Sequence, residues 1–199
     1  MRRRRGSKQE PGGPGDAQSH NRVPLPADDG PRRDAGRGLA ILKPGTAAPE
    51  FALPDQDGRE SRLSALVSGG PLILYFYPAD FTPGCTKEAC DLRDLHAQII
   101  SSGLTVVGVS PQSPESHRRF REKYGLPFTL LSDESKSAIK AYGVDGPLGM
   151  GVRRATFLID GQQSIVDAVL ADLRIGRHRA FVECAIEVRA SRSASLPSG

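Results

Sequence analysis

The sequence has few cysteines and no long apolar run, and both absences narrow the class of protein. Three cysteines in 199 residues cannot make the dense, even-numbered disulfide framework of small secreted domains. We therefore interpret them as free thiols in a reducing compartment. No stretch of about 18 apolar residues is present, so we expect no membrane span.

The N-terminal segment also lacks the features of a targeting signal. Four arginines at residues 2–5 lead directly into glycine, proline and polar residues, without the apolar segment of a secretory signal. Five acidic residues among the first 40 argue against an organelle transit peptide. We expect a cytoplasmic protein in which residues 1–40 are a disordered, basic, Gly/Pro-rich leader, residues 41–190 fold, and residues 191–199 are a disordered tail.

The excess of positive over negative charge is confined to the leader. The formal net charge is +4, and residues 1–40 alone hold nine basic and five acidic residues. The rest of the chain is balanced, with 18 residues of each sign. A nucleic-acid-binding domain usually carries its excess charge on the folded surface, so we expect no nucleic-acid partner.

Strand and helix patterns alternate along the chain. Apolar, β-branched runs predict strands at 72–77, 104–109, 128–131, 155–159 and 165–170, and two short strands flank an Asp-Gly turn, at 51–53 and near Leu63. Apolar periodicity and Pro or Gly boundaries predict helices at 85–101, 114–124, 132–142 and 176–189. Strands joined by crossover helices and followed by a hairpin indicate an α/β fold: a central mixed sheet with helices on both faces. This order resembles the thioredoxin-like fold.

Chemistry is concentrated where the strand at 72–77 passes through a Pro/Gly-rich turn into the next helix. Cys85 falls in the first turn of that helix, where unpaired N–H groups and the helix dipole favour an anion. A thiolate is the nucleophilic form of cysteine. Thr82 can offer its hydroxyl to the sulfur or to a bound oxygen. An inert buried cysteine is the alternative, but the turn, the helix start and Cys90 five residues later favour a nucleophile.

These residues resemble a known family. Pro78, Thr82 and Cys85 match the Pro-x-x-x-Thr-x-x-Cys pattern of peroxiredoxins. The segment at 82–90, Thr-Pro-Gly-Cys-Thr-x-Glu-Ala-Cys, is similar to the Q-type branch, also called bacterioferritin comigratory protein, and the likeness spans about residues 43–188. The resemblance implies a thiol peroxidase that reduces hydrogen peroxide and organic hydroperoxides without a metal or organic cofactor and is recycled by thioredoxin or a thioredoxin-like protein.

The same resemblance implies a role for each site residue. Cys85 would be the peroxidatic cysteine and Cys90 the resolving cysteine that closes an intrachain disulfide. Arg154 would join Thr82 around the peroxide, and Glu88 would be a supporting hydrogen-bond partner. From its position alone, Arg154 would be interpreted as a surface charge.

The spacing of the two cysteines predicts a conformational change. Five residues of ideal helix separate Cα atoms by roughly 8–9 Å, whereas a disulfide needs about 4.4–6.8 Å. We therefore expect the first turns of the helix to unwind after oxidation. Because an intrachain pair needs no second subunit, we expect a monomer.

Other functions use some of the same residues. Cys-x4-Cys is compatible with zinc, but the remaining candidates, His96, His178 and Cys184, form no second close pair. A disulfide oxidoreductase would usually show Cys-x-x-Cys, which is absent. A peroxide sensor that oxidises a partner protein would use the same cysteines. A pure binding module is disfavoured because a core accounts for the apolar pattern.

Three further residues are predicted to be structural. Cys184 shares helical spacing with Phe181 and Val188, so we expect it to pack in the core. His117 and His178 are single histidines that we expect to be structural or exposed.

Overall fold

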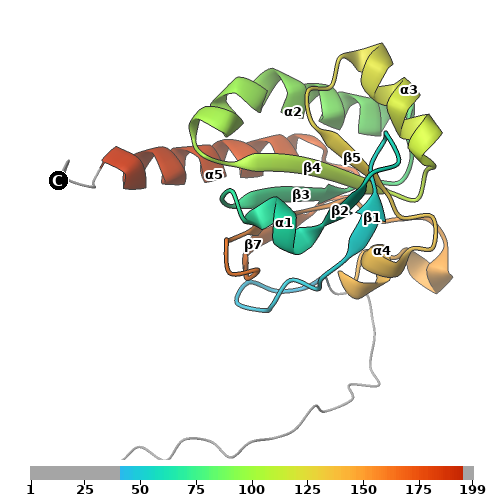
Figure 1. Cartoon of the computed structure of the whole chain (residues 1–199), viewed down its shortest axis with the longest axis horizontal. Helices are drawn as coiled ribbons and strands as arrows, with labels where there is room; N and C mark the ends of the chain where they lie inside the picture. The colour runs from blue at the N-terminus through green and yellow to red at the C-terminus, as the bar shows by residue number, and fades with distance from the viewer. Residues whose placement is uncertain (1–40, 195–199) are drawn as a thin grey trace, which may run out of the picture. The chain divides into compact units, whose positions relative to one another are not determined.

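The computed structural model describes residues 41–194, which form a five-stranded sheet covered by helices on both faces (Figure 1). The strands are β1 Ala52–Pro54, β2 Glu60–Arg62, β3 Leu72–Phe76, β4 Thr105–Ser110, β5 Thr129–Ser132, β6 Ala155–Ile159 and β7 Ile165–Leu170. The helices are α1 Leu63–Val67, α2 Pro83–Ser101, α3 Pro114–Tyr124, α4 Ser137–Ala141 and α5 Gly176–Ala194, with a 3-10 turn at Pro147–Gly149. The predicted leader, residues 1–40, and residues 195–199 lie outside the described residues. Residues 191–194, predicted as tail, are helical.

The sheet has the order β5-β4-β3-β6-β7. β3, β4 and β5 run parallel, and β6 is antiparallel to both β3 and β7. At the centre, Leu74 pairs with Val107 on one side and with Phe157 on the other. The mixed thioredoxin-like sheet predicted from the sequence is confirmed.

β3 is the central strand and all five of its residues are buried. Successive side chains of a strand point to opposite faces, so this strand supplies two cores. Ile73 and Tyr75 pack with apolar residues of α2, α3 and α5. Leu72 and Leu74 pack on the other face with residues of α1 and α4. The unbroken apolar run is therefore the signature of a strand buried on both faces.

α3 begins and ends as predicted. Ser113 precedes it and its hydroxyl accepts a hydrogen bond from the Ser116 N–H at 3.3 Å. Pro114 takes the first helical position. Gly125 ends the helix in the left-handed region, at φ 61°, which glycine adopts without strain.

Two predicted boundaries were wrong. Leu63 begins helix α1 rather than lying in a strand. The helix predicted from Ser132 begins at Ser137, because Ser132 still belongs to β5. The carboxylate of Asp133 then accepts hydrogen bonds from the N–H groups of Ser137 and Ile139, both at 2.8 Å, and so holds the start of α4.

The predicted core position of Cys184 was also wrong. Cys184 is exposed and Val188 is 46% exposed, whereas Val182 and Ala185 are buried against the sheet. Each helical residue turns about 100°, so Cys184 points about 200° away from Val182. The buried face of α5 is narrower than the apolar spacing suggested.

Candidate active site

Cys85 lies in the first turn of α2, directly after the turn that leaves the carboxyl end of β3. Pro83 takes the first helical position, where a missing N–H leaves no hydrogen bond unmade. A Cβ at Gly84 would lie 3.1 Å from Cδ1 of Ile175 and 3.2 Å from Nη2 of Arg154, so a larger residue would fit only if these side chains shifted. Cys85 is a free cysteine and is only 2% exposed.

Arg154 lies immediately before β6 and joins Cys85 to Glu88. Its Nη2 donates to Cys85 Sγ at 3.3 Å, and its Nη1 donates to Glu88 Oε2. The backbone N–H of Arg154 donates to Asp172 Oδ1 at 2.8 Å, which holds the residue in place. Burial alone would lower the pKa of Arg154, but Glu88 and Cys85 beside it raise that pKa above its ordinary value. The guanidinium therefore stays charged beside the Cys85 sulfur. The surface position considered for Arg154 is excluded, since it is 5% exposed.

Glu88, one turn along α2, is 1% exposed and forms an ion pair with Arg154. Burial raises the pKa of Glu88 to about 7, although Arg154 opposes that rise. Its second oxygen, Oε1, has no hydrogen-bond partner among residues 41–194. Nδ1 of His178 lies 3.5 Å from Oε1. Glu88 is therefore a buried carboxyl whose protonation changes close to neutral pH.

Thr82 and Pro78, the other two motif residues, border the site. The Thr82 hydroxyl donates to the carbonyl oxygen of Ala79 at 3.2 Å, so in this structure it stabilises the turn. Among residues 41–194, no hydrogen bond joins Thr82 to Cys85. Pro78 lines a pocket together with Arg154.

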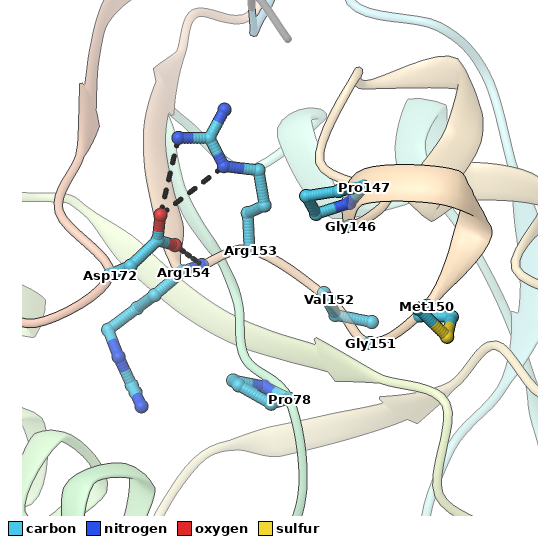
Figure 2. A pocket seen from close by; sticks show the side chains of 9 residues that line it. All are labelled: Pro78, Gly146, Pro147, Met150, Gly151, Val152, Arg153, Arg154 and Asp172. Carbon is cyan, nitrogen blue, oxygen red and sulfur yellow. Dashed lines mark hydrogen bonds and ion pairs between the residues drawn. The ribbon is translucent and has the colours of Figure 1, made fainter.

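The pocket beside Arg154 has a volume of about 340 Å³ (Figure 2). Its lining combines backbone and apolar groups with one ion pair, Arg153–Asp172 at 3.2 Å. Figure 2 shows Arg153 turned toward Asp172 on one side of the pocket, with Met150 on another wall. Met150 is 70% exposed. Arg154 lines the pocket, whereas Cys85 and Thr82 are not among its lining residues, and its volume is large enough for an organic group.

Cys90 is in the same helix as Cys85 and is half-buried. Both cysteines are free and both lie within the continuous helix α2. The helical geometry between them keeps their Cα atoms farther apart than a disulfide spans. Cys85 and Cys90 are therefore unbonded within an intact helix, and this is the arrangement from which the predicted unwinding would start.

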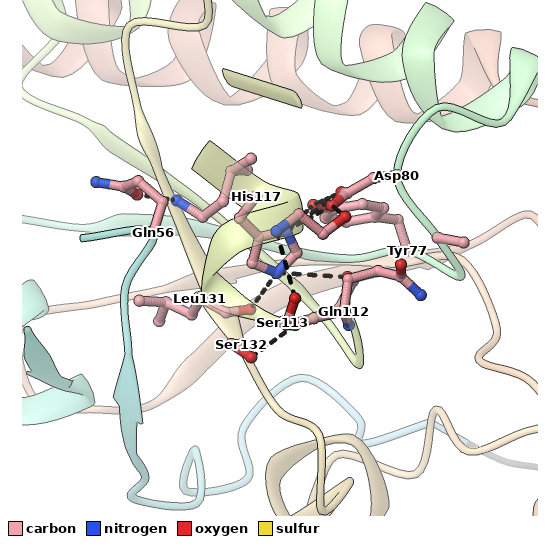
Figure 3. Close-up of polar contacts among 12 residues, drawn as sticks. Gln56, Tyr77, Asp80, Gln112, Ser113, His117, Leu131 and Ser132 are labelled. Carbon is pink, nitrogen blue, oxygen red and sulfur yellow. Dashed lines mark hydrogen bonds and ion pairs between the residues drawn. The ribbon is translucent and has the colours of Figure 1, made fainter. Parts of the chain in front are cut away.

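A buried polar network that the sequence did not reveal anchors the turn before Cys85 (Figure 3). The Tyr77 hydroxyl donates to Asp80 Oδ1 at 2.8 Å, and Nδ1 of His117 lies 2.9 Å from Asp80 Oδ2. Nε2 of His117 faces the carbonyl oxygen of Leu131 at 3.1 Å. Burial alone would raise the pKa of Asp80, but the hydrogen bonds from His117 and Ser116 lower it. His117 is thus structural, and its distance of 37 residues from Asp80 left no local signal in the sequence.

Two negative findings apply to residues 41–194. They contain no group of three or more His, Cys, Asp or Glu side chains arranged to hold a metal ion. None of their helices has the length and apolar character needed to cross a membrane.

Comparison with known proteins identifies the family. Residues 44–168 match the AhpC/TSA family. A putative peroxiredoxin bcp of Coxiella burnetii is 42% identical over 147 residues, which cover 71% of this chain and 96% of the relative. The chain belongs to the peroxiredoxins. A chloroplastic peroxiredoxin Q of Populus jackii is 48% identical over 123 residues, 61% of this chain and 57% of the relative.

Solved structures agree with this assignment. Peroxidoxin BcpB from Mycobacterium tuberculosis superposes with a TM-score of 0.70 at 37% identity, covering 74% of this chain and 97% of that one. The bacterioferritin comigratory protein of Xanthomonas campestris gives a TM-score of 0.66 at 30% identity, covering 77% and 99%. This peroxiredoxin is of the Q type and is a thiol peroxidase, as its motif predicted. Peroxiredoxins as a family act on hydroperoxides with thioredoxin-type reductants.

Proposed function

We propose that Cys85 is the peroxidatic cysteine, that Cys90 is the resolving cysteine, and that Arg154 stabilises both the thiolate and the departing oxygen. The 3.3 Å contact between Arg154 Nη2 and Cys85 Sγ at a buried helix N-terminus carries the proposal. Helix dipole and guanidinium act on the same atom and favour its anionic form. A water-excluded site strengthens both interactions.

The chemistry proceeds in two steps. The Cys85 thiolate attacks one oxygen of the peroxide, the O–O bond breaks, and Cys85 becomes a sulfenic acid while the other oxygen takes a proton and leaves as water or an alcohol. The Cys90 thiolate then attacks the Cys85 sulfur, the S–S bond forms, and hydroxide takes a proton to leave as water. An external dithiol returns two electrons by thiol–disulfide exchange.

The proposal also covers the class of peroxide, the reductant, the oligomeric state and the cellular compartment. The 340 Å³ pocket next to Arg154 supports organic hydroperoxides as well as hydrogen peroxide, and the similar Xanthomonas campestris protein is described by its alkyl peroxide reduction activity. We propose thioredoxin as the reductant and a monomer in the cytoplasm. A thiol–disulfide oxidoreductase or a peroxide sensor on the same fold is the alternative, and slow turnover with excess thioredoxin would favour it.

Mass mapping after one equivalent of hydrogen peroxide tests the cysteine roles. Reduced wild-type protein should give a Cys85–Cys90 disulfide as the main product. Cys90→Ser removes the second nucleophile, so a dimedone-trapped sulfenic acid should accumulate at Cys85. A disulfide that joins Cys85 to Cys184, or dimedone label mainly on Cys90, would contradict the assignment.

Disulfide formation should unwind the start of α2. The helix holds the two cysteines too far apart to bond, so oxidised protein should lose amide protection over residues 84–92. Hydrogen exchange followed by mass spectrometry on reduced and oxidised protein measures this, and Cys90→Ser treated with peroxide is the matched control without a disulfide. Equal protection of residues 84–92 in the oxidised and reduced wild type would refute the unwinding.

A further inference from the structure

His178 on α5 is buried behind the site, although its sequence context suggested no functional role. It is 1% exposed. Nε2 lies 3.1 Å from the carbonyl oxygen of Ala171, and Nδ1 lies 2.9 Å from the Thr156 hydroxyl and 3.5 Å from Glu88 Oε1. A carbonyl oxygen only accepts hydrogen bonds, so Nε2 carries a hydrogen and a neutral His178 presents a lone pair at Nδ1.

That tautomer leaves Glu88 without a partner unless a proton is added. An ionised Glu88 has only lone pairs on Oε1, and Oε1 lies 3.5 Å from an Nδ1 whose lone pair already accepts a hydrogen bond from the Thr156 hydroxyl at 2.9 Å. Among residues 41–194, this buried oxygen has no hydrogen-bond partner. One proton placed on either atom would make this contact attractive, so the geometry can accommodate a pair that shares a single proton.

The charged surroundings are compatible with a shared proton near neutral pH. Burial raises the pKa of Glu88 to about 7 and lowers the pKa of His178. Glu88 faces groups on its own helix and on neighbouring strands: Cys85, Asp91, Arg154 and the hydroxyl of Tyr75. His178 faces Arg154, Asp172 and Arg177. The negative charge of Asp91 favours protonation of Glu88, and Arg154 opposes it.

We propose that His178 is a positioning residue of the peroxidatic centre: it shares one proton with Glu88 and thereby sets the charge that competes with Cys85 for Arg154. This inference rests on the proposed role of Cys85. With the proton present, the Glu88–His178 pair is neutral and the guanidinium charge is directed at the thiolate. Without it, the Glu88 carboxylate takes more of that charge, and the thiolate is less stable.

Two substitutions separate this role from simple packing. His178→Gln keeps a donor for the Ala171 carbonyl but has no atom at Nδ1, whereas His178→Asn keeps a polar atom near Nδ1 and loses the donor. His178→Gln should raise the pH midpoint of iodoacetamide alkylation at Cys85 by about 0.5 unit, a threefold change in the thiolate equilibrium. His178→Asn should remain closer to wild type. Mass mapping of the Cys85 peptide across a pH series measures the midpoint in the full chain.

The proposal would be wrong if the two variants shifted the alkylation midpoint in the opposite way. If His178 only holds the Ala171 carbonyl, His178→Gln will match wild type and His178→Asn will show the shift. In a Glu88→Gln background, His178→Gln should cause no further shift, because the shared proton is already gone. A shift of the same size in that background would also refute the role through Glu88.

Separate control experiments test whether the His178 variants fold and whether the proposed function holds. Thermal unfolding shows which His178 variants keep their structure. If neither does, Glu88→Gln alone remains informative, because removing the competing carboxylate should lower the Cys85 midpoint, and a higher midpoint would contradict the proposal. Peroxidase activity that persists in Cys85→Ser would defeat the proposed function, whereas an unchanged alkylation midpoint in His178→Gln would defeat only this inference.

Discussion

Cys85→Ser should abolish peroxide consumption, with a loss of on the order of 10³-fold or more in the second-order rate constant. Serine is close in size and fits the same buried position, but its hydroxyl does not ionise near neutral pH, so Arg154 and the helix dipole have no nucleophile to stabilise. The measurement is consumption of hydrogen peroxide by reduced protein, in one turnover and with thioredoxin present.

Variants of the other two cysteines test whether the loss of activity is specific to Cys85. Cys184→Ser changes an exposed thiol on the outer side of α5 and should turn over like wild type. Cys90→Ser should complete one turnover at the wild-type rate and then stop with thioredoxin as reductant. If Cys85→Ser consumed peroxide at the wild-type rate, the nucleophile would be misassigned, and the zinc and oxidoreductase interpretations would reopen.

Arg154→Lys should lower the same rate constant by about 10²–10³-fold, the usual effect of removing one preorganised donor. The guanidinium reaches Cys85 and Glu88 with different nitrogens, which a single ammonium on a flexible stem cannot reproduce. The substitution keeps a positive charge near buried Glu88, so the fold should survive. Single-turnover peroxide consumption measures the rate constant, and thermal unfolding checks the fold.

The matched control is Arg118→Lys. Arg118 is a half-exposed arginine of α3 that pairs with Glu115 on the surface, and such pairs contribute little. The rate constant of the Arg118→Lys protein should equal that of wild type. An Arg154→Lys protein that differed no more than this control would show that the guanidinium takes no part in the reaction.

Local sequence patterns predicted much of the fold. Pro114 and Gly125 bound α3 as predicted, because a missing N–H and a left-handed backbone are properties of single residues. The apolar run at residues 72–77 predicted the central strand, and the turn after it placed Cys85 at a helix start. Where a prediction was wrong, a contact between segments decided the outcome: β5 pairing extends through Ser132 and delays α4.

The sequence by itself determined the strand–turn–helix that presents Cys85 and, through its motif, the family. Only the tertiary structure brought Arg154 to the sulfur, since the two residues are 69 positions apart. It also brought His178 within 3.5 Å of Glu88, and it turned Cys184 away from the core. Periodicity records which face of one element is apolar, but not which polar groups meet when separate elements pack. Packing also fixed the desolvation that raises the pKa of Glu88, because burial belongs to the assembled fold rather than to any one segment.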